Sequence, residues 1–322
     1  MLIRWLPTET NIGFVRHRKL FMAFSVFLIV AAIILFATRG LNFGVDFRGG
    51  ILLEIKTTGP ADLSDLRTRL GALGLGGVTL QEFGAPDDVL INVQRQEGDE
   101  AAQIEAINLI KQELGDQVAE YRRTEFVGPK VGDELKEAGI LATVLSLLGI
   151  AVYIWFRFEW QFSVAALIAL IHDVLATIGF YALTQIEFNL ATLAAVLMIA
   201  GYSINDTVVV FDRVRETMRK YKKMALPELF NRAVNDTLSR TILTSTTTLM
   251  ALIALFLFGG LVIQGFTIGL IWGVVIGTYS SIGIAVPLLL YLGVRRSALT
   301  AEDGGEGKAS GKARGKAGAK AS

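Results

Sequence analysis

Residues 188–211 read FNLATLAAVLMIAGYSINDTVVVF. As an α-helix, this apolar run is long enough to cross the roughly 30 Å hydrocarbon core of a membrane, yet it carries a carboxylate at Asp206. A charge in such a segment is costly and usually faces the interior of a helical bundle or water. The run therefore predicts a membrane-spanning helix with a functional acid.

Five further apolar runs predict a polytopic α-helical membrane protein with six transmembrane helices. These runs are 20–38, 138–156, 162–183, 242–263 and 266–292, so that five of the six spans form one bundle over 138–292. The first run is long for the core of a signal peptide, and Ala37-Thr38-Arg39-Gly40 is a poor cleavage site. We therefore expect the first run to be retained as an anchor.

The composition excludes several kinds of site. Hydrophobic residues make up 52% of the chain, and its 33 glycines are typical of closely packed membrane helices. There is no cysteine, and the histidine count is 2, which excludes disulfides, thiolate metal sites and a histidine-rich metal centre. The formal net charge is +1, so general attraction to nucleic acid is not expected.

Basic residues predict the orientation of the chain. Lysine and arginine are concentrated in 1–19, 212–240 and 293–322, whereas the connections at 184–187 and 259–260 carry none. Because basic residues favour the cytoplasmic side, these three segments are predicted to be cytoplasmic: the N-terminus, one loop and the tail. The tail is rich in Ala, Gly and Lys without apolar periodicity, and we expect it to be disordered.

The insert at 39–137 is then external, in the periplasm, and has the pattern of a small α+β domain. Strand-like and helical segments follow one another in the order β-α-β-β-α-β, which predicts a ferredoxin-like fold. The expected strands are 51–57, 78–83, 89–93 and 118–127, the expected helices are 61–73 and 99–114, and a turn is expected at 84–87.

Arg240 is the expected partner of Asp206. Counting 1.5 Å per residue from Phe188 places Asp206 about 27 Å into its span, near the level at which the next span begins. A carboxyl group removed from water holds a proton more tightly, and a nearby guanidinium, which cannot itself release a proton, weakens that hold. We expect Asp206 and Arg240 to form a proton-coupling pair; the alternatives are a static polar lock and a position at the membrane surface.

Other polar residues of the spans are candidates for a polar interior. The threonines after Arg240 recur at helical spacing and are expected to face this interior instead of lipid. For the acid and the histidine of the third span, the alternative is a hydrogen-bonded packing role. The candidates are Asp173, His172, Asn205, Thr244, Thr247 and Thr248.

Two sets of glycines indicate close packing and a turn. Gly269, Gly273 and Gly277 recur every four residues, which predicts close contact between helices. A second set lies in Asn42–Gly50, which reads NFGVDFRGG. No Gly-Lys-Ser/Thr follows it and a span precedes it, so it is not a phosphate loop. We expect an ordered turn between the anchor and the first strand, formed by Gly44, Asp46, Gly49 and Gly50.

The same nine residues resemble the Asn-x-Gly-x-Asp-Phe-x-Gly-Gly signature of the SecD/SecF protein-export family. Six spans with one modest external domain resemble the smaller subunit of this family, and not SecD. Further segments are similar to family motifs, namely Val127–Gly132, Ile171–Asp173, Gly201–Arg213 and Ser239–Thr241.

The resemblance implies an RND-superfamily membrane fold and a non-enzymatic accessory subunit of the Sec protein translocase in the bacterial inner membrane. It implies use of the proton motive force in late export, with protons as the coupling ion, no cofactor or metal, and Asp206 and Arg240 at the proton-coupling positions. The implied partners are SecD, the SecYEG translocon, YajC, exported preprotein and the lipid bilayer.

Two other functions remain open on the residues alone. A proton-coupled RND-type exporter of small solutes also needs intramembrane charge, although the external insert is small for capturing solutes. An intramembrane aspartyl protease needs two acids, but the Gly-x-Gly-Asp motif of that class is absent before Asp206. From helix rise, Asp173 and Asp206 are expected to differ in depth by about 10 Å or more.

Overall fold

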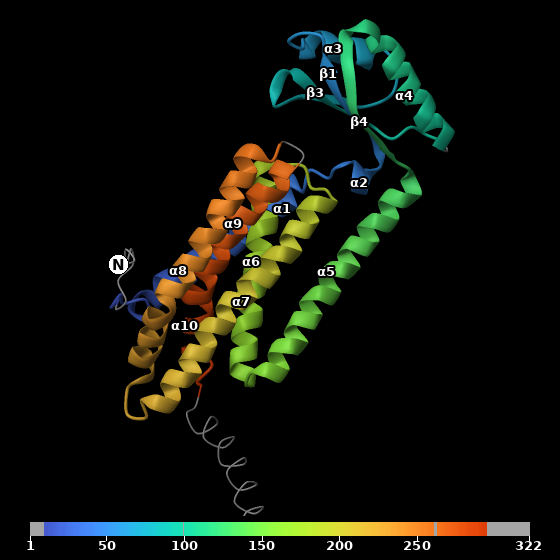
Figure 1. Ribbon diagram of the computed structural model, residues 1–322. Coiled ribbons are helices and arrows are strands. Elements are labelled where there is room, and N and C mark those ends of the chain that lie inside the picture. The colour runs from blue at the N-terminus through green and yellow to red at the C-terminus, as the bar shows by residue number, and fades with distance from the viewer. Residues whose placement is uncertain (1–9, 99, 261–262, 295–322) are drawn as a thin grey trace, which may run out of the picture.

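The computed structural model describes residues 10–98, 100–260 and 263–294, and it consists of a helical bundle with a small α/β domain at one end (Figure 1). The domain is inserted between α1 and α5. The bundle contains η1 (Val15–His17), α1 (Arg18–Arg39), α5 (Pro129–Arg157), α6 (Trp160–Thr184), α7 (Leu190–Lys220), α8 (Leu226–Phe258), α9 (Gln264–Ser280), a π-helix (Ser281–Ala285) and α10 (Val286–Tyr291).

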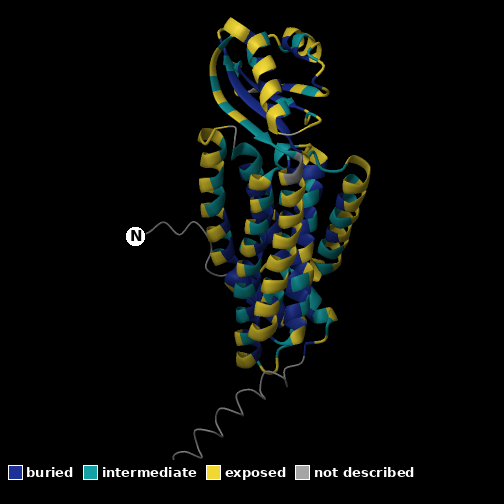
Figure 2. Ribbon diagram, turned by 90° about the vertical axis from the view of Figure 1, so that its right-hand side faces the viewer, coloured by how far each residue is buried: buried dark blue, intermediate teal, exposed yellow. Residues whose placement is uncertain are grey.

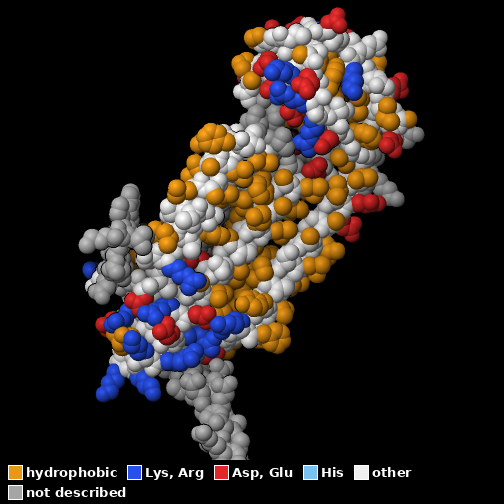
Figure 3. All heavy atoms as spheres, in the orientation of Figure 1, with side chains coloured by type: hydrophobic (Ala, Val, Ile, Leu, Met, Phe, Trp, Pro, Cys, Tyr) orange, Lys and Arg blue, Asp and Glu red, His pale blue; other side chains and the backbone are white. Residues whose placement is uncertain are grey.

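Six helices are long and apolar enough to cross a membrane in the described part of the chain, the last being the continuous run 264–291. In Figure 3, hydrophobic side chains form a band around the visible face of the bundle, while charged side chains gather at its two ends. Large apolar side chains point outward from α1 and α5, including Phe27, Ile33, Leu145 and Trp155. This is the pattern of a polytopic membrane protein, since lipid, unlike water, accepts exposed apolar surface.

The helices α6, α7 and α9 form the centre of the bundle, with α1, α5 and α8 around them. Buried residues accordingly run through the middle of the bundle, and exposed ones cover its outside (Figure 2). Small residues permit close contact: Gly179 of α6 lies against Ala32 of α1. The structure also places the three glycines of α9 against neighbouring helices, Gly269 at Tyr181 of α6 and Gly273 and Gly277 at Ile199 and Ser203 of α7.

Gly273→Val is therefore expected to destabilise the bundle. A Cβ atom at Gly273 would overlap the side chain of Ile199, and overpacking of this kind costs about 1–3 kcal/mol. Thermal unfolding of the purified chain in detergent would measure the loss. The matched control is Gly149→Val on the exposed face of α5, where a Cβ atom meets nothing within 4 Å. Equal melting temperatures for the two variants would contradict the close contact of α9 with α7.

The α/β domain has the predicted ferredoxin-like order of elements. Its strands are β1 (Gly50–Thr57), β2 (Val78–Phe83), β3 (Ala85–Val93) and β4 (Val118–Val127), and the sheet order is β2-β3-β1-β4 with all neighbours antiparallel. The helices α3 (Leu63–Gly71) and α4 (Glu100–Leu114) pack on one face through Leu70 and Ile110, against Leu53 and Ile91 of the sheet. The short helices α2 (Val45–Arg48) and η2 (Gly115–Gln117) complete the domain.

Several expected boundaries differ from the observed ones. The expected loop 212–240 is mostly helical, because α7 continues to Lys220 and α8 begins at Leu226. A continuous apolar run marks only the part of a helix that lies within the membrane. Beyond it, α7 and α8 continue as amphipathic helices, and Val214 and Leu229 are buried between these extensions. The helix α5 likewise starts at Pro129, inside the segment assigned to the external domain, and α8 ends at Phe258.

The expected turn at 84–87 is also shorter than predicted. Gly84 alone separates β2 from β3, at a φ of 99° that favours glycine, and Pro86 belongs to β3. Pro86 is tolerated because it precedes the residues of β3 that pair with β1. Of the expected cytoplasmic segments 1–19 and 293–322, residues 1–9 and 295–322 lie outside the described residues.

Candidate functional site

Asp206 is buried where three helical segments meet. Its Oδ1 accepts a hydrogen bond from Thr241 Oγ1 of α8 at 2.8 Å, and its Oδ2 accepts one from Ser281 Oγ at 2.6 Å. Only 7% of the residue is exposed. Two hydroxyl donors therefore hold a carboxyl group that is almost removed from solvent, as expected for a buried acid that needs polar partners.

Asp173 of α6 is fully buried and has a similar cage. His172 Nδ1 lies 2.9 Å from Oδ1, while Oδ2 accepts a hydrogen bond from Ser280 Oγ at 2.6 Å and a second one from Ser203 of α7. Together, the two acids and their side-chain partners form what we call the polar centre: His172, Asp173, Ser203, Asp206, Thr241, Ser280 and Ser281.

Consecutive serines contact the two acids. Ser280 ends α9 and Ser281 begins the π-helix, and adjacent helical side chains point about 100° apart, so the pair reaches acids on different helices. Ser203, a partner of Asp173, lies one helical turn before Asp206 on α7. The two acids therefore differ in depth by about one turn, roughly 5 Å, and the expectation of about 10 Å or more was too large.

Arg240 precedes Thr241, the partner of Asp206 on α8, but does not itself bond the carboxyl group. No ion pair within 4.0 Å joins these two side chains in the structure, and Arg240 is exposed on the surface of α8. The hydroxyls of Thr241 and Ser281, not the guanidinium, therefore fill the immediate surroundings of the carboxyl group.

The predicted interior stripe of polar residues is wrong for most of its members. Three of them are exposed and Thr248 is half-buried; the exposed ones are Asn205, Thr244 and Thr247. The threonine hydroxyls donate hydrogen bonds to main-chain carbonyls of their own helix. The interior face of α8 is instead the i, i+4 pair Thr241 and Ser245. The sequence of α8 carries hydroxyl side chains on two of its faces and contains no signal that selects between them.

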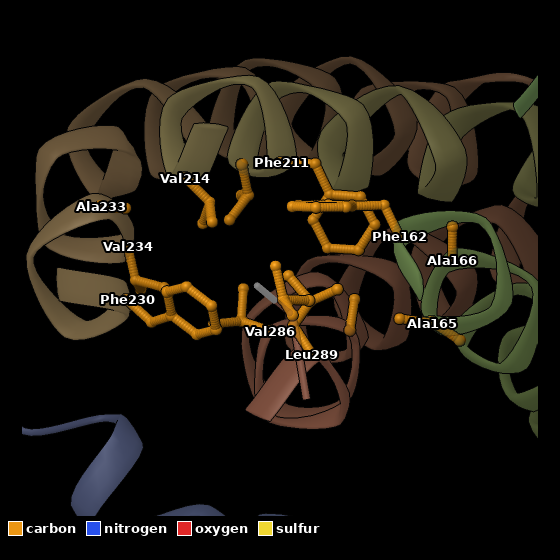
Figure 4. Packing of buried hydrophobic residues seen from close by; sticks show 14 of the residues in the cluster. Phe162, Ala165, Ala166, Phe211, Val214, Phe230, Ala233, Val234, Val286 and Leu289 are labelled. Carbon is orange, nitrogen blue, oxygen red and sulfur yellow. The ribbon is translucent and has the colours of Figure 1, made fainter. Parts of the chain in front are cut away.

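Apolar clusters bound the polar centre along the helix axes. On the side away from the domain, α6, α7, α8 and α10 pack Phe162, Phe211, Phe230 and Val286 together (Figure 4). On the domain side, Val174, Tyr181 and Phe188 pack with Val196 of α7. In this conformation the acids are therefore separated from both ends of the bundle by close-packed side chains.

The turn motif Asn42–Gly50 joins the domain to the bundle. Asp46 Oδ2 accepts a hydrogen bond from Leu190 N at 2.8 Å, at the N-terminus of α7, where a carboxylate is favoured. Gly44 lies against Glu187 in the α6–α7 connection, and a side chain there would overlap that carboxyl group. Gly49 and Gly50 have φ values of 70° and 130°, which glycine adopts most readily.

Glu187 is half-buried beside this motif, and its surroundings predict a pH dependence. Burial, and then the Asp46 carboxylate, raise the pKa of Glu187 above its ordinary value of 4.5, while Arg123 of β4 opposes the shift. The native state thus holds the proton more tightly than the unfolded chain does. Native stability is therefore expected to fall as pH rises from about 4.5 through the raised native pKa.

Glu187→Gln removes this ionisation. The variant is expected to melt at a higher temperature than the wild type above this pH window and at the same temperature below it. Melting curves between about pH 4 and pH 8 test this, with the exposed Glu105→Gln of α4 as the control. A constant difference between wild type and Glu187→Gln at every pH would contradict it.

Most of the chain is similar in sequence to known protein-export subunits. The family model described as protein export membrane protein SecD/SecF, C-terminal, matches residues 107–295, and the SecD/SecF GG motif model matches residues 34–61. A protein translocase subunit SecF of Cereibacter sphaeroides is 46% identical over 302 residues, which cover 91% of this chain and 93% of that protein. A Rickettsia felis protein of the same name is 44% identical over 91% of this chain and 96% of its own.

Solved structures of SecDF have a similar fold. The crystal structure of SecDF from Thermus thermophilus, titled a translocon-associated membrane protein, matches with a TM-score of 0.81 at 31% identity over 90% of this chain. SecDF in a super-membrane-facing form matches with a TM-score of 0.66 at 33% identity over 93%. The chain spans about 40% of the length of the first and about 41% of the second.

Proposed function

The chain belongs to the SecD/SecF family of protein-export membrane proteins, as a SecF subunit of the Sec protein translocase with an RND-like fold, and we propose that it uses the proton motive force to promote late export of preproteins. The observation that carries this proposal is the burial of Asp206 between Thr241 and Ser281. A buried acid held by hydroxyls, with a guanidinium near, can bind and release a proton as its surroundings change.

The apolar clusters on both sides of the polar centre support a moving bundle. A proton reaches Asp206 from one side and leaves to the other only if the helices separate at one end and then at the other. The two SecDF structures have nearly the same sequence identity to this chain, 31% and 33%, but their TM-scores are 0.81 and 0.66. This difference supports more than one arrangement of the family fold.

The exposed face of α7 and α8 supports a partner subunit within the membrane. Asn205, Arg240 and Thr244 are exposed there, and polar or charged side chains facing lipid are costly. Membership of the translocase implies association with SecD and the translocon, and we propose that SecD covers this face. YajC and the emerging preprotein are further proposed partners, on the family resemblance alone.

The proposed orientation places both termini in the cytoplasm and the external domain in the periplasm. Helix movement at the polar centre then reaches the domain through α7, whose first residue is bonded to Asp46 of the turn motif. The open face of the sheet lies across a cleft of about 1310 Å³ from the end of the bundle, so the domain has space to move. The moving domain would act on preprotein as it emerges.

Export into translocase-containing membrane vesicles would test this function. Preprotein translocation is compared with and without this chain, and with and without a protonophore, and protease protection separates complete from partial translocation. We expect the chain to increase complete translocation only when the gradient is present, and partly translocated preprotein to accumulate when either is missing. Equal stimulation in the presence of the protonophore would refute proton coupling.

A further inference from the structure

Asp173 and His172 form a buried ionisable pair that the proton step proposed for Asp206 does not use. The two side chains meet at 2.9 Å, and 0% of Asp173 and 5% of His172 are exposed. His172 Nε2 is buried without a hydrogen-bond partner in the described part of the chain. A buried polar atom left unpaired costs about 1–3 kcal/mol, which a packing role does not explain.

The serines beside the two acids can satisfy each acid in both of its protonation states. Ser280 Oγ has two acceptors within reach, Asp173 Oδ2 at 2.6 Å and the Gly277 carbonyl at 3.1 Å. Ser281 Oγ has Asp206 Oδ2 at 2.6 Å and the Thr278 carbonyl at 3.0 Å.

A hydroxyl has one proton and can also accept. When the acid is ionised, the serine donates to it. When the acid is protonated, the acid donates to the serine, which turns its own proton to the carbonyl. Neither change requires the main chain to move.

Two elements touch both acids. The junction of α9 with the π-helix supplies Ser280 to Asp173 and Ser281 to Asp206. Helix α7 carries Asp206 and also supplies Ser203 to Asp173. A single turn of π-helix inside a longer helix is often found at functional sites, because it changes the direction of successive side chains. A shift of either element that changes the hydrogen bonds of one acid therefore also changes those of the other.

We infer that Asp173, with His172, is a second proton-binding site, and that the Ser280–Ser281 pair couples its occupancy to that of Asp206. Coupling of the two sites rests on the proposed function for its role in export, whereas proton binding at Asp173 does not. The ring of Tyr279 of α9 lies beside that of His172, with the centroids 6.3 Å apart, and the Tyr279 hydroxyl contacts Ser25 Oγ and the Phe21 carbonyl of α1.

Infrared titration of the full chain in lipid nanodiscs would test this inference. Aspartate is labelled with carbon-13 at its carboxyl group, and the spectrum of Asp173→Asn is subtracted from that of the wild type across the pH range. We expect the difference to contain one titrating carboxyl band. The matched control is Thr177→Val, which alters a buried hydroxyl one turn away that bonds only the main chain of Asp173. This variant should keep the band.

Coupling is read from the midpoint of the same band. Asp206→Asn is expected to move the Asp173 midpoint by about 0.7–2.2 pH units, the shift that corresponds to a typical coupling between two sites. In Ser280→Ala/Ser281→Ala the band should persist, while Asp206→Asn no longer moves its midpoint. His172→Gln should also move the midpoint, and it serves as the test if Asp173→Asn does not fold.

The outcomes separate this inference from the proposed function. A difference spectrum without a titrating band, or an unchanged midpoint in His172→Gln, would overturn proton binding at Asp173, whatever the export assay shows. A midpoint that ignores Asp206→Asn would overturn the coupling. If Asp173 titrates and couples as expected but export does not respond to the gradient, the proposed function fails and the second site stands.

Discussion

Asp206→Asn is expected to abolish the gradient-dependent part of export while leaving the fold intact. The amide keeps the shape of the carboxyl group and can bond Thr241 and Ser281, but it cannot take up a proton at working pH. A membrane potential supplies about 2.3 kcal/mol per charge per 100 mV, a factor of about 50 in an equilibrium constant. We therefore expect stimulation by the gradient to fall at least about tenfold in the vesicle assay.

The control for this variant is Asp212→Asn on the same helix. Asp212 is exposed and pairs with Arg157 at 3.0 Å, an interaction worth about 0–1 kcal/mol at a surface. It should export like the wild type at equal protein level. If Asp206→Asn and Asp212→Asn are stimulated equally, the acid of the fourth span is not the coupling group.

Gly50→Ala is expected to weaken the connection between the α/β domain and the bundle. Gly50 begins β1 at a φ of 130°, and a Cβ atom would lie 2.6 Å from the Val93 carbonyl oxygen of β3. Strain of this kind costs about 1–3 kcal/mol, and the clash adds to it, so the end of β1 next to the turn motif must shift. We expect a lower melting temperature and loss of gradient-stimulated export, with titration of Asp206 unchanged.

Gly59→Ala, in a loop of the same domain, is the matched control, because a Cβ atom there meets nothing within 4 Å. It should match the wild type in stability and export. Wild-type export by Gly50→Ala would show that the domain does not need this connection, and loss of Asp206 titration in Gly50→Ala would show that the variant damages the bundle itself.

The sequence was sufficient for the features that depend on one segment at a time. An acid inside an apolar run identified Asp206, and short apolar segments bounded by turn residues identified all four strands of the α/β domain. The turn motif was identified from its glycines, and Gly49 and Gly50 have positive φ values in the structure. A buried charge and a glycine are both unfavourable in a regular helix or strand, so each stands out in the sequence.

The partners of the two acids could not be identified in this way. A hydroxyl side chain is tolerated anywhere in a membrane helix because it can bond the main chain of its own helix. No local sequence pattern therefore distinguishes Ser203, Ser280 and Ser281 from other serines. Their role depends on how α6, α7 and α9 pack. The choice of Thr244 over Thr241 failed for the same reason, because only the packing of α8 decides which stripe faces inward.

Proton movement during export tests the central claim most directly. Liposomes containing the translocase and this chain are loaded with a pH-sensitive dye, a gradient is imposed, and preprotein export is started. The account predicts export-linked proton movement with the wild type and with Asp212→Asn, and none above background with Asp206→Asn. Proton movement by Asp206→Asn at the wild-type rate, in step with export, would contradict it.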